Sequence, residues 1–213
     1  MLIIFDCDGV LVDSEPLVQR VEMAMIAELG WPITREEMFD EHLGRDWATV
    51  ETNIERHIGR PLPPDFNERR IAATKEAFKR ELRPVEGIGA AIATLTSRGH
   101  RMCVASSSAR WRIEFALGIT GLLEIFNNHI YSASEVPNGK PAPDLFLHAA
   151  DRMSAGPTDC VVVEDSPAGV AAARAAGMSV IGYVGLTPAR LLHEAQTVID
   201  HMDLLPSAIA QLR

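Results

Sequence analysis

The first residues constrain the fold of this chain more than any other stretch. An unbroken apolar run, Leu2–Phe5, is followed by two aspartates on alternate positions, Asp6 and Asp8, and then by Gly9. Side chains alternate along a strand, so both carboxylates start on one side, and a glycine permits a sharp turn. Two close carboxylates repel each other unless a cation or a shared proton intervenes. The run predicts a buried strand that ends either in a solvated acidic turn or in a site for Mg²⁺, which binds one or two carboxylates together with water and phosphate.

The region from residue 15 to 82 has a helical pattern without any strand. Apolar residues recur at helical spacing after Pro16 and stop at Gly30, and the pair Thr34 and Glu37 indicates a capping box. Further helices are expected at 46–58 and 64–82. The expected domains are a core of residues 1–14 and 83–213 and an inserted helical cap domain of residues 15–82.

From Val85 onward, strand and helix patterns alternate. The further strands are expected at 101–105, 129–132, 160–163, 179–182 and, at an edge, 197–199. The helices between and after them are expected at 87–97, 109–117, 144–152, 168–176 and 206–212. Such alternation predicts a parallel sheet with helices on both faces. The fold class is therefore α/β, a Rossmann-like parallel sheet core with an inserted all-helical cap domain.

Polar residues follow the carboxyl ends of three expected strands, which is where open parallel sheets bind ligands. These residues are Asp6 and Asp8, then Ser106, Ser107 and Ser108, then Glu164 and Asp165. A loop stiffened by two prolines carries Lys140 between the second and third groups. Taken singly, each group is also typical of a helix cap or an exposed loop. Together they provide carboxylates, hydroxyls, amides and a cation, the components of a phosphoryl-transfer site.

Composition narrows the range of partners. The 213 residues are 47% hydrophobic, enough for a packed interior, and the net charge is −9. This charge argues against binding nucleic acid or an anionic membrane, both of which need clustered Lys and Arg, but not against a small anionic substrate. No apolar stretch approaches the length of a membrane span, and we expect a cytoplasmic protein. Cys7, Cys103 and Cys160 are expected to be reduced core residues.

The motifs, in this order, resemble those of haloacid dehalogenase superfamily phosphatases. Asp6-Cys7-Asp8-Gly9-Val10 is similar to the first motif of that family, Ser106 to the second, Lys140 to the third and Glu164-Asp165 to the fourth. The resemblance covers essentially the whole chain, and the helical insertion corresponds to the cap of the β-phosphoglucomutase-like branch. It implies Mg²⁺-dependent hydrolysis of a phosphate monoester through an aspartyl-phosphate.

The resemblance also implies a role for each motif residue. Asp6 would be the nucleophile, and Asp8 the general acid and later the general base. The groups implied to bind phosphoryl oxygens are Ser106, the amide of Ser107, and Lys140. The groups implied to hold Mg²⁺ are Asp6, the main-chain carbonyl of Asp8, Asp165 and, directly or through water, Glu164.

The sequence indicates the substrate less clearly than it indicates the motif residues. Glu15 at the edge of the cap, together with Arg45 and Trp47 where the helical pattern is interrupted, are candidates for contacts with it. An arginine can bind an anionic or hydroxylated leaving group, although Arg45 is equally compatible with a plain surface position. A small phosphorylated metabolite, a sugar phosphate or sugar-acid phosphate, fits the branch. Phosphoglycolate and nucleotide monophosphates stay open, and we expect a monomer or weak dimer.

Three other functions are alternatives to a phosphatase. A haloacid dehalogenase is disfavoured because those enzymes lack the second aspartate, here Asp8. A β-phosphoglucomutase-type mutase is the main alternative, but Val18 stands where the mutases carry a histidine. A phospho-receiver binding module would carry its phosphorylated aspartate after the third strand, whereas the runs at Met102 and His129 end in serines.

Overall fold

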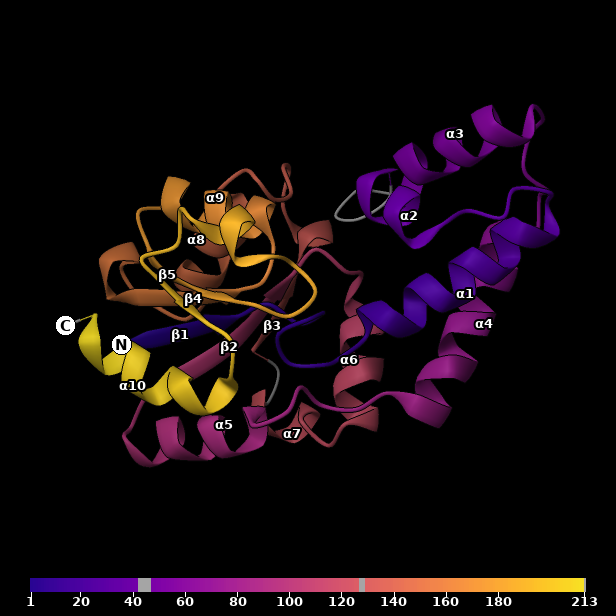
Figure 1. Ribbon diagram of the computed structural model, residues 1–213. Coiled ribbons are helices and arrows are strands. Elements are labelled where there is room, and N and C mark those ends of the chain that lie inside the picture. Colours follow the sequence, from indigo (N-terminus) through magenta and orange to yellow (C-terminus); the bar gives the residue numbers. More distant parts are fainter. Residues whose placement is uncertain (42–46, 127–128, 213) are drawn as a thin grey trace. The chain divides into compact units, whose positions relative to one another are not determined.

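The computed structural model describes residues 1–41, 47–126 and 129–212, with the backbone alone at 39 and 40. Its contacts divide the chain into two compact units. One unit consists of Met1–Asp13 and Arg83–Arg213, and the other of Ser14–Leu82. The first contains a sheet and its covering helices, and the second contains helices but no strand among its described residues (Figure 1).

The larger unit is built on a six-stranded parallel sheet of order β3-β2-β1-β4-β5-β6. The strands are β1 (Leu2–Phe5), β2 (Arg101–Ser106), β3 (Ile130–Ser132), β4 (Cys160–Glu164), β5 (Ser179–Tyr183) and β6 (Thr197–Ile199). Phe5 at the end of β1 lies opposite Val104 of β2 and Val163 of β4. The strand order reverses between β1 and β4, and such a reversal opens a crevice at the carboxyl ends of the strands. The predicted α/β fold is confirmed.

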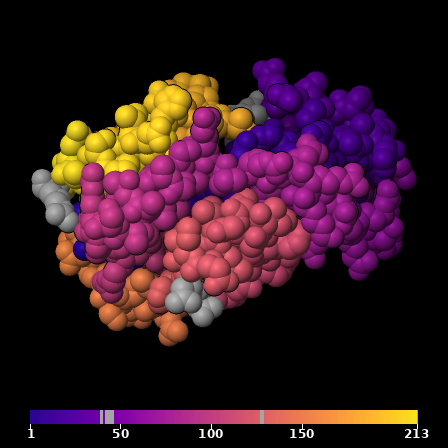
Figure 2. Space-filling view, turned by 90° about the horizontal axis from the view of Figure 1, so that it is seen from below, coloured from indigo at the N-terminus to yellow at the C-terminus, as the bar shows by residue number. Residues whose placement is uncertain are grey.

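Helices cover both faces of this sheet. They are α5 (Ile88–Ser97), α6 (Arg110–Ile119), α7 (Leu123–Phe126), α8 (Asp144–Arg152), α9 (Pro167–Ala175) and α10 (Leu205–Gln211). Leu2 and Ile4 share a buried cluster with residues of α8 and α9. Phe5 points the other way and meets Phe126 of α7 edge to face, with ring centroids 6.0 Å apart. Figure 2 shows α5, α6 and α7 covering that second face.

The helical unit has a core of its own. Its helices are α1 (Glu15–Glu28), α2 (Arg35–Glu41), α3 (Trp47–Ile58) and α4 (Phe66–Glu81). Ile26, Ile54 and Phe66 are buried in one cluster within this unit. The predicted capping box is confirmed, since Thr34 N donates to Glu37 Oε2 at 2.7 Å and Glu37 N donates to Thr34 Oγ1 at 3.2 Å.

Most differences from the predicted elements are shifts of one or two residues at their ends, where helices and strands fray. Unpredicted elements are α7 and four short 3₁₀ helices, Ala133–Glu135, Pro157–Asp159, Ala189–Leu192 and Met202–Leu204, which have too few residues to produce a recognisable period. The three cysteines are buried and free, as expected. None of the helices in the described part of the chain combines the length and the apolar character that a membrane span requires.

Candidate active site

Asp6 begins the polar site at the centre of the sheet. Its amide donates to Val163 O at 3.0 Å, which continues the β1–β4 pairing one residue past the end of β1. The residue is buried, with 7% of its surface exposed. Its carboxylate Oδ1 accepts a 2.6 Å hydrogen bond from Lys140 Nζ. The strand therefore delivers a carboxylate into the interior, where it is paired with a cation.

Lys140 joins this carboxylate to a second one. It lies between β3 and α8, and its side chain is 4% exposed. Besides Asp6, Nζ contacts Glu164 Oε1 at 2.7 Å and the carbonyl oxygen of Ala105 at 3.2 Å. Burial by itself would lower the pKa of Lys140, but the Asp6 and Glu164 carboxylates outweigh it and raise the pKa above its ordinary value. The lysine is thus held as a cation, and the reading of it as an exposed loop residue is excluded.

Glu164 uses both carboxylate oxygens within the protein. Oε1 accepts from Lys140, and Oε2 accepts from the amide of Ser166 at 2.7 Å and from its hydroxyl at 2.9 Å. The hydroxyl of Ser166 in turn accepts from Gly169 N and caps α9. The cap is therefore Ser166 and neither acidic residue, and Glu164 orients the lysine.

Asp165 reaches from the end of β4 to the turn that follows β1. Gly9 in that turn has φ of 79°, a backbone conformation that side chains other than glycine's rarely adopt. A methyl group added at Gly9 would overlap the Asp165 carboxylate. Asp165, only 3% exposed, is therefore packed directly against the main chain next to Asp8.

This donor set fits a small, hard cation such as Mg²⁺. In the described part of the chain, no three His, Cys, Asp or Glu side chains are already arranged around a metal position. Mg²⁺ does not require such a cage, because it is usually bound by one or two carboxylates, with water and phosphate completing its shell. Asp6 and Asp165 supply buried carboxylates at the ends of neighbouring strands, and the Asp8–Gly9 backbone lies between them. Lys140 pairs with Asp6 and Glu164, and Asp165 is a third buried carboxylate at this edge, so a cation would offset the excess negative charge.

Burial and the neighbouring charges together determine the protonation of Asp6. Burial raises the pKa of Asp6, Lys140 opposes the rise and Glu164 adds to it, with a result of about 7 against an ordinary value of 3.8. The folded protein therefore binds a proton at Asp6 between pH 4 and 7 that the unfolded chain does not. The stabilisation that this proton provides is complete below the unfolded pKa and is lost as the pH rises through 7.

We therefore expect Asp6→Asn to stabilise the protein in EDTA at alkaline pH. Asparagine has no proton to lose, so at pH 8 its free energy of unfolding should exceed that of wild type by on the order of 3 kcal/mol. The difference should shrink toward zero as the pH falls to 4. Urea unfolding from pH 4 to 8 measures it, with Asp151→Asn, at an exposed position, as the matched control. A difference between Asp6→Asn and wild type that does not change with pH would contradict the prediction.

Asp8 has partners that the sequence analysis missed. Its carboxylate Oδ2 accepts a 2.6 Å hydrogen bond from Ser108 Oγ, and Oδ1 accepts a 3.0 Å hydrogen bond from Arg112 Nη2. Arg112 lies in the first turn of α6, more than one hundred residues away along the chain. The two aspartates of the first motif thus have separate partners, Lys140 for Asp6 and the pair Ser108 and Arg112 for Asp8.

The serines after β2 do not cap α6. The N-cap is Ala109, and no side chain caps this end. Ser106 is buried at the end of β2, and its hydroxyl accepts from Ser108 N at 3.1 Å. Ser107 is exposed. Ser106 and Ser107 therefore lie at the same edge of the sheet as Asp6, in positions compatible with binding phosphoryl oxygens.

The candidate substrate residues belong to the helical unit. Glu15 begins α1 and Trp47 begins α3, whereas Arg45 lies outside the described residues. The Trp47 ring stacks on Phe66, with centroids 6.2 Å apart, and the Arg70 guanidinium lies 4.0 Å from its centroid. Trp47 therefore packs within its own unit, and substrate contacts by Glu15, Arg45 and Trp47 stay a prediction.

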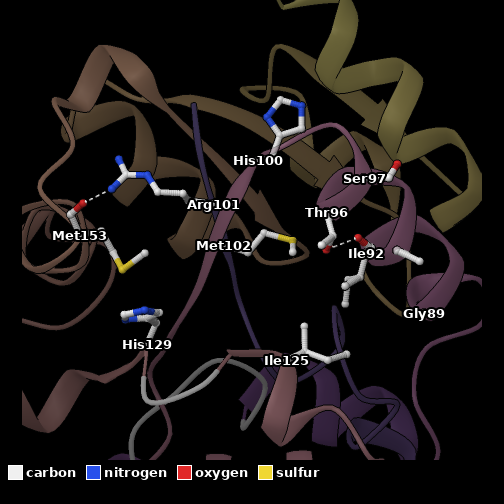
Figure 3. Close-up of a pocket in the computed structure, with 11 residues that line it drawn as sticks. Gly89, Ile92, Thr96, Ser97, His100, Arg101, Met102, Ile125, His129 and Met153 are labelled. Carbon is white, nitrogen blue, oxygen red and sulfur yellow. Dashed lines mark hydrogen bonds between the residues drawn. The ribbon is translucent and has the colours of Figure 1, made fainter.

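A separate pocket of about 810 Å³ lies at the opposite edge of the sheet (Figure 3). Arg101 and Met102, at the start of β2, contribute to its lining together with residues of α5 and α7. Arg101 donates to Met153 O at 2.6 Å and Thr96 donates to Ile92 O at 2.8 Å, so both side chains already bind main-chain carbonyl groups. The volume suits a small ligand. Open parallel sheets, however, bind their ligands beyond the carboxyl ends of the strands, so the active site is expected at the other edge, where the carboxylates converge.

Comparisons with known proteins identify the family of this chain. A sequence profile of haloacid dehalogenase-like hydrolases matches residues 1–177. The chain is 30% identical over 207 residues to 6-phosphogluconate phosphatase of Escherichia coli K12, covering 96% of this chain and 92% of the relative. It is 33% identical over 181 residues to hexitol phosphatase B of the same strain, covering 82% and 79%. A conserved haloacid dehalogenase-like protein of unknown function from Agrobacterium tumefaciens has a TM-score of 0.86 at 37% identity, over 99% of this chain and 98% of that one.

Proposed function

The chain belongs to the haloacid dehalogenase-like hydrolases, and we propose that it is a Mg²⁺-dependent phosphatase acting on a sugar phosphate or sugar-acid phosphate through an aspartyl-phosphate on Asp6. The observation that carries this proposal is the buried triad of Asp6, Lys140 and Glu164. Lys140 holds one oxygen of the Asp6 carboxylate at 2.6 Å, which leaves the other oxygen as the nucleophile.

In the first step, a carboxylate oxygen of Asp6 attacks phosphorus while the bond from phosphorus to the substrate oxygen breaks. Asp8, in its protonated form, gives its proton to that oxygen, and the alcohol leaves. Lys140, Ser106 at the end of β2 and the amide of Ser107 bind the phosphoryl oxygens as charge shifts in the transition state. The products of this step are an alcohol and an aspartyl-phosphate.

In the second step, a water molecule attacks the same phosphorus atom from the side that the alcohol left. Asp8, now a carboxylate, takes the proton of the water, and the bond between phosphorus and the Asp6 oxygen breaks. Inorganic phosphate leaves, Asp6 regains its carboxylate, and Asp8 regains its proton. One residue can serve both steps because the first leaves it in the form that the second needs.

Asp6, the Asp8 carbonyl and Asp165 would hold Mg²⁺, with Glu164 reaching it through water because its oxygens are occupied by Lys140 and Ser166. The cation supplies charge neutralisation between the carboxylates and the phosphoryl group. The burial of Asp6 and Asp165 keeps competing water away from the site.

The substrate class rests on the relatives. Two of them are named for phosphatase activity, one on 6-phosphogluconate and one on hexitol phosphates. Both names describe polyhydroxylated carbon chains with a phosphate monoester. The same chemistry is proposed here, with the helical unit and its candidates Glu15, Arg45 and Trp47 contacting the hydroxylated part.

We expect hydrolysis to depend on Mg²⁺ and to be suppressed by Ca²⁺. Ca²⁺ takes six to eight ligands at about 2.3–2.6 Å, against six at about 2.0–2.1 Å for Mg²⁺, so it competes for carboxylate oxygens that must stay reactive. The measurement is phosphate release from a panel of sugar, sugar-acid, glycolate and nucleotide phosphates with each cation.

The same panel distinguishes the alternatives. A mutase would interconvert phosphosugar isomers without a stoichiometric release of phosphate, which analysis of the sugar products detects. Full activity after rigorous metal removal, or equal turnover with Ca²⁺, would contradict the proposed cation. Failure to release phosphate from every ester in the presence of Mg²⁺ would contradict the proposed function.

A further inference from the structure

Arg112 is a cation in contact with Asp8 that the proposed chemistry leaves without a role. Its Nη2 donates to Asp8 Oδ1 at 3.0 Å, and the two side chains are 25% and 20% exposed. Partly buried ion pairs of this kind are screened less by salt than fully exposed pairs. The arginine comes from the first turn of α6, four residues after Ser108, the last of the three consecutive serines. Its contact therefore joins the general acid to the rigid start of a helix.

The second partner of Asp8 is anchored differently. Ser108 Oγ donates to Asp8 Oδ2 at 2.6 Å. Ser108 itself is fixed through its main chain, because its amide donates to Ser106 Oγ at 3.1 Å and its carbonyl accepts from Ser132 Oγ at 2.8 Å. Its hydroxyl hydrogen can still turn to another acceptor without moving the backbone.

The two contacts therefore differ in how easily they are exchanged. A guanidinium is always charged and presents a planar set of donors, so its bond to a carboxylate is directional and strong. The Ser108 hydroxyl carries no charge of its own, and although its 2.6 Å bond to the carboxylate is short, the hydroxyl hydrogen can turn away so that another donor replaces it. For Asp8 to pass a proton to or from a reacting oxygen, one carboxylate oxygen must give up its present partner, and Oδ2 is the one bound by the replaceable group.

We propose that Arg112 is a positioning residue for Asp8, which holds Oδ1 throughout the reaction while Oδ2 exchanges Ser108 for the leaving oxygen and then for water. The inference rests on the proposed function, because it assumes that Asp8 is the general acid and base. According to this proposal, α6, which lies outside the four motifs that resemble the family, orients the carboxylate of Asp8.

A purely structural role for Arg112 predicts something different. If the ion pair only fastened the turn after β1 to α6, its loss would lower stability and would slow every substrate by the same factor. Positioning of the acid predicts a loss that depends on the leaving group, since p-nitrophenolate needs little protonation and an alkoxide needs much. The two roles are thus separable by substrate.

The test compares kcat/KM for an alkyl phosphate with kcat/KM for p-nitrophenyl phosphate. This constant reports on the first chemical step alone only when that step is irreversible. For Arg112→Met we expect a loss of about 10- to 100-fold on the alkyl ester and less than about threefold on p-nitrophenyl phosphate. Arg112→Lys should recover part of the loss, because it keeps the charge but not the planar fork. Arg110→Met, in the same turn of α6, is the matched control, because Arg110 pairs with Glu114 and Glu135.

A double-mutant cycle with Asp8→Asn completes the test. If Arg112 acts through Asp8, Arg112→Met should cost less than about twofold on the alkyl ester once Asp8 is asparagine. Equal losses on both esters, or an undiminished loss in the Asp8→Asn background, would overturn the inference while leaving the phosphatase activity of wild type intact. Should Arg112→Met fail to fold, Arg112→Lys and Arg112→Gln carry the same comparison. Absence of hydrolysis by wild type would instead contradict the proposed function.

Discussion

Asp6→Asn is expected to abolish phosphate release in the presence of Mg²⁺ while leaving the fold unchanged. The amide has nearly the same shape as the carboxylate but is a far weaker nucleophile at phosphorus, so we expect kcat to fall by at least about 10³-fold. The Lys140 contact with Glu164 at 2.7 Å does not involve Asp6, so the lysine stays paired. The measurement is phosphate release by wild type and Asp6→Asn on the best ester of the panel.

Two further observations make this result specific. Wild type quenched in acid during turnover should carry a phosphoryl group that hydroxylamine removes, and Asp6→Asn should carry none, because only the carboxylate can form an acyl phosphate. Asp151→Asn on the exposed end of α8 should keep wild-type turnover. Substantial Mg²⁺-dependent turnover by correctly folded Asp6→Asn would rule out Asp6 as the nucleophile.

The sheet and the position of the candidate site could be predicted from the sequence because both follow from short, local patterns. A buried parallel strand needs only four or five consecutive apolar residues, and Leu2–Phe5 and the first four residues of β4 provide such runs. The carboxyl ends of such strands share one edge of the sheet, so Asp6 and Glu164 were expected to converge. The 2.6 and 2.7 Å contacts that Lys140 makes with them meet that expectation.

The partners of Asp8 were not accessible in the same way. Arg112 lies on a helix whose apolar period indicates which face is buried, but the period does not say which distant side chain an arginine reaches. Ser108 was open to interpretation as a helix cap, a role that serines before a helix often have. The structure gives Ser108 another acceptor, Asp8, and leaves Ala109 at the N-cap. Long-range pairing of polar side chains depends on tertiary packing, which no local pattern encodes.

Trp47 illustrates a second limit. An aromatic residue next to an interruption in a helical pattern is compatible with a ligand contact and with packing. The structure shows packing within the helical unit, against Phe66 and beneath Arg70, whose guanidinium also donates to Glu22 at 2.9 Å. An arginine that is already paired and whose side chain is only 15% exposed favours the local role of this tryptophan. Substrate contacts in the cap are therefore better tested first at Glu15.

Lys140→Met should have a large effect on stability as well as on activity. The substitution keeps an unbranched side chain one atom shorter than lysine but removes the cation that Asp6 and Glu164 share, at positions 7% and 1% exposed. Removing one partner of a buried pair leaves charge without compensation and costs about 3–5 kcal/mol. We expect that loss in the free energy of unfolding at pH 8 in EDTA, measured in urea, together with a fall in kcat of at least about 10²-fold because the phosphoryl group loses its cation.

The pH dependence identifies the cause of that loss. Lys140 lowers the pKa of Asp6, so in Lys140→Met the Asp6 carboxyl should bind its proton more readily. The loss in the free energy of unfolding should therefore shrink as the pH falls from 8 to 5. Adding Asp6→Asn to Lys140→Met should restore part of the stability at pH 8, because one of the two uncompensated carboxylates is gone. Lys79→Met on α4, at a lysine whose side chain is 56% exposed, is the control and should change stability by less than about 0.5 kcal/mol. A Lys140→Met protein as stable as wild type at pH 8 would show that these carboxylates are not held by this lysine, and the proposed site would lose its central contact.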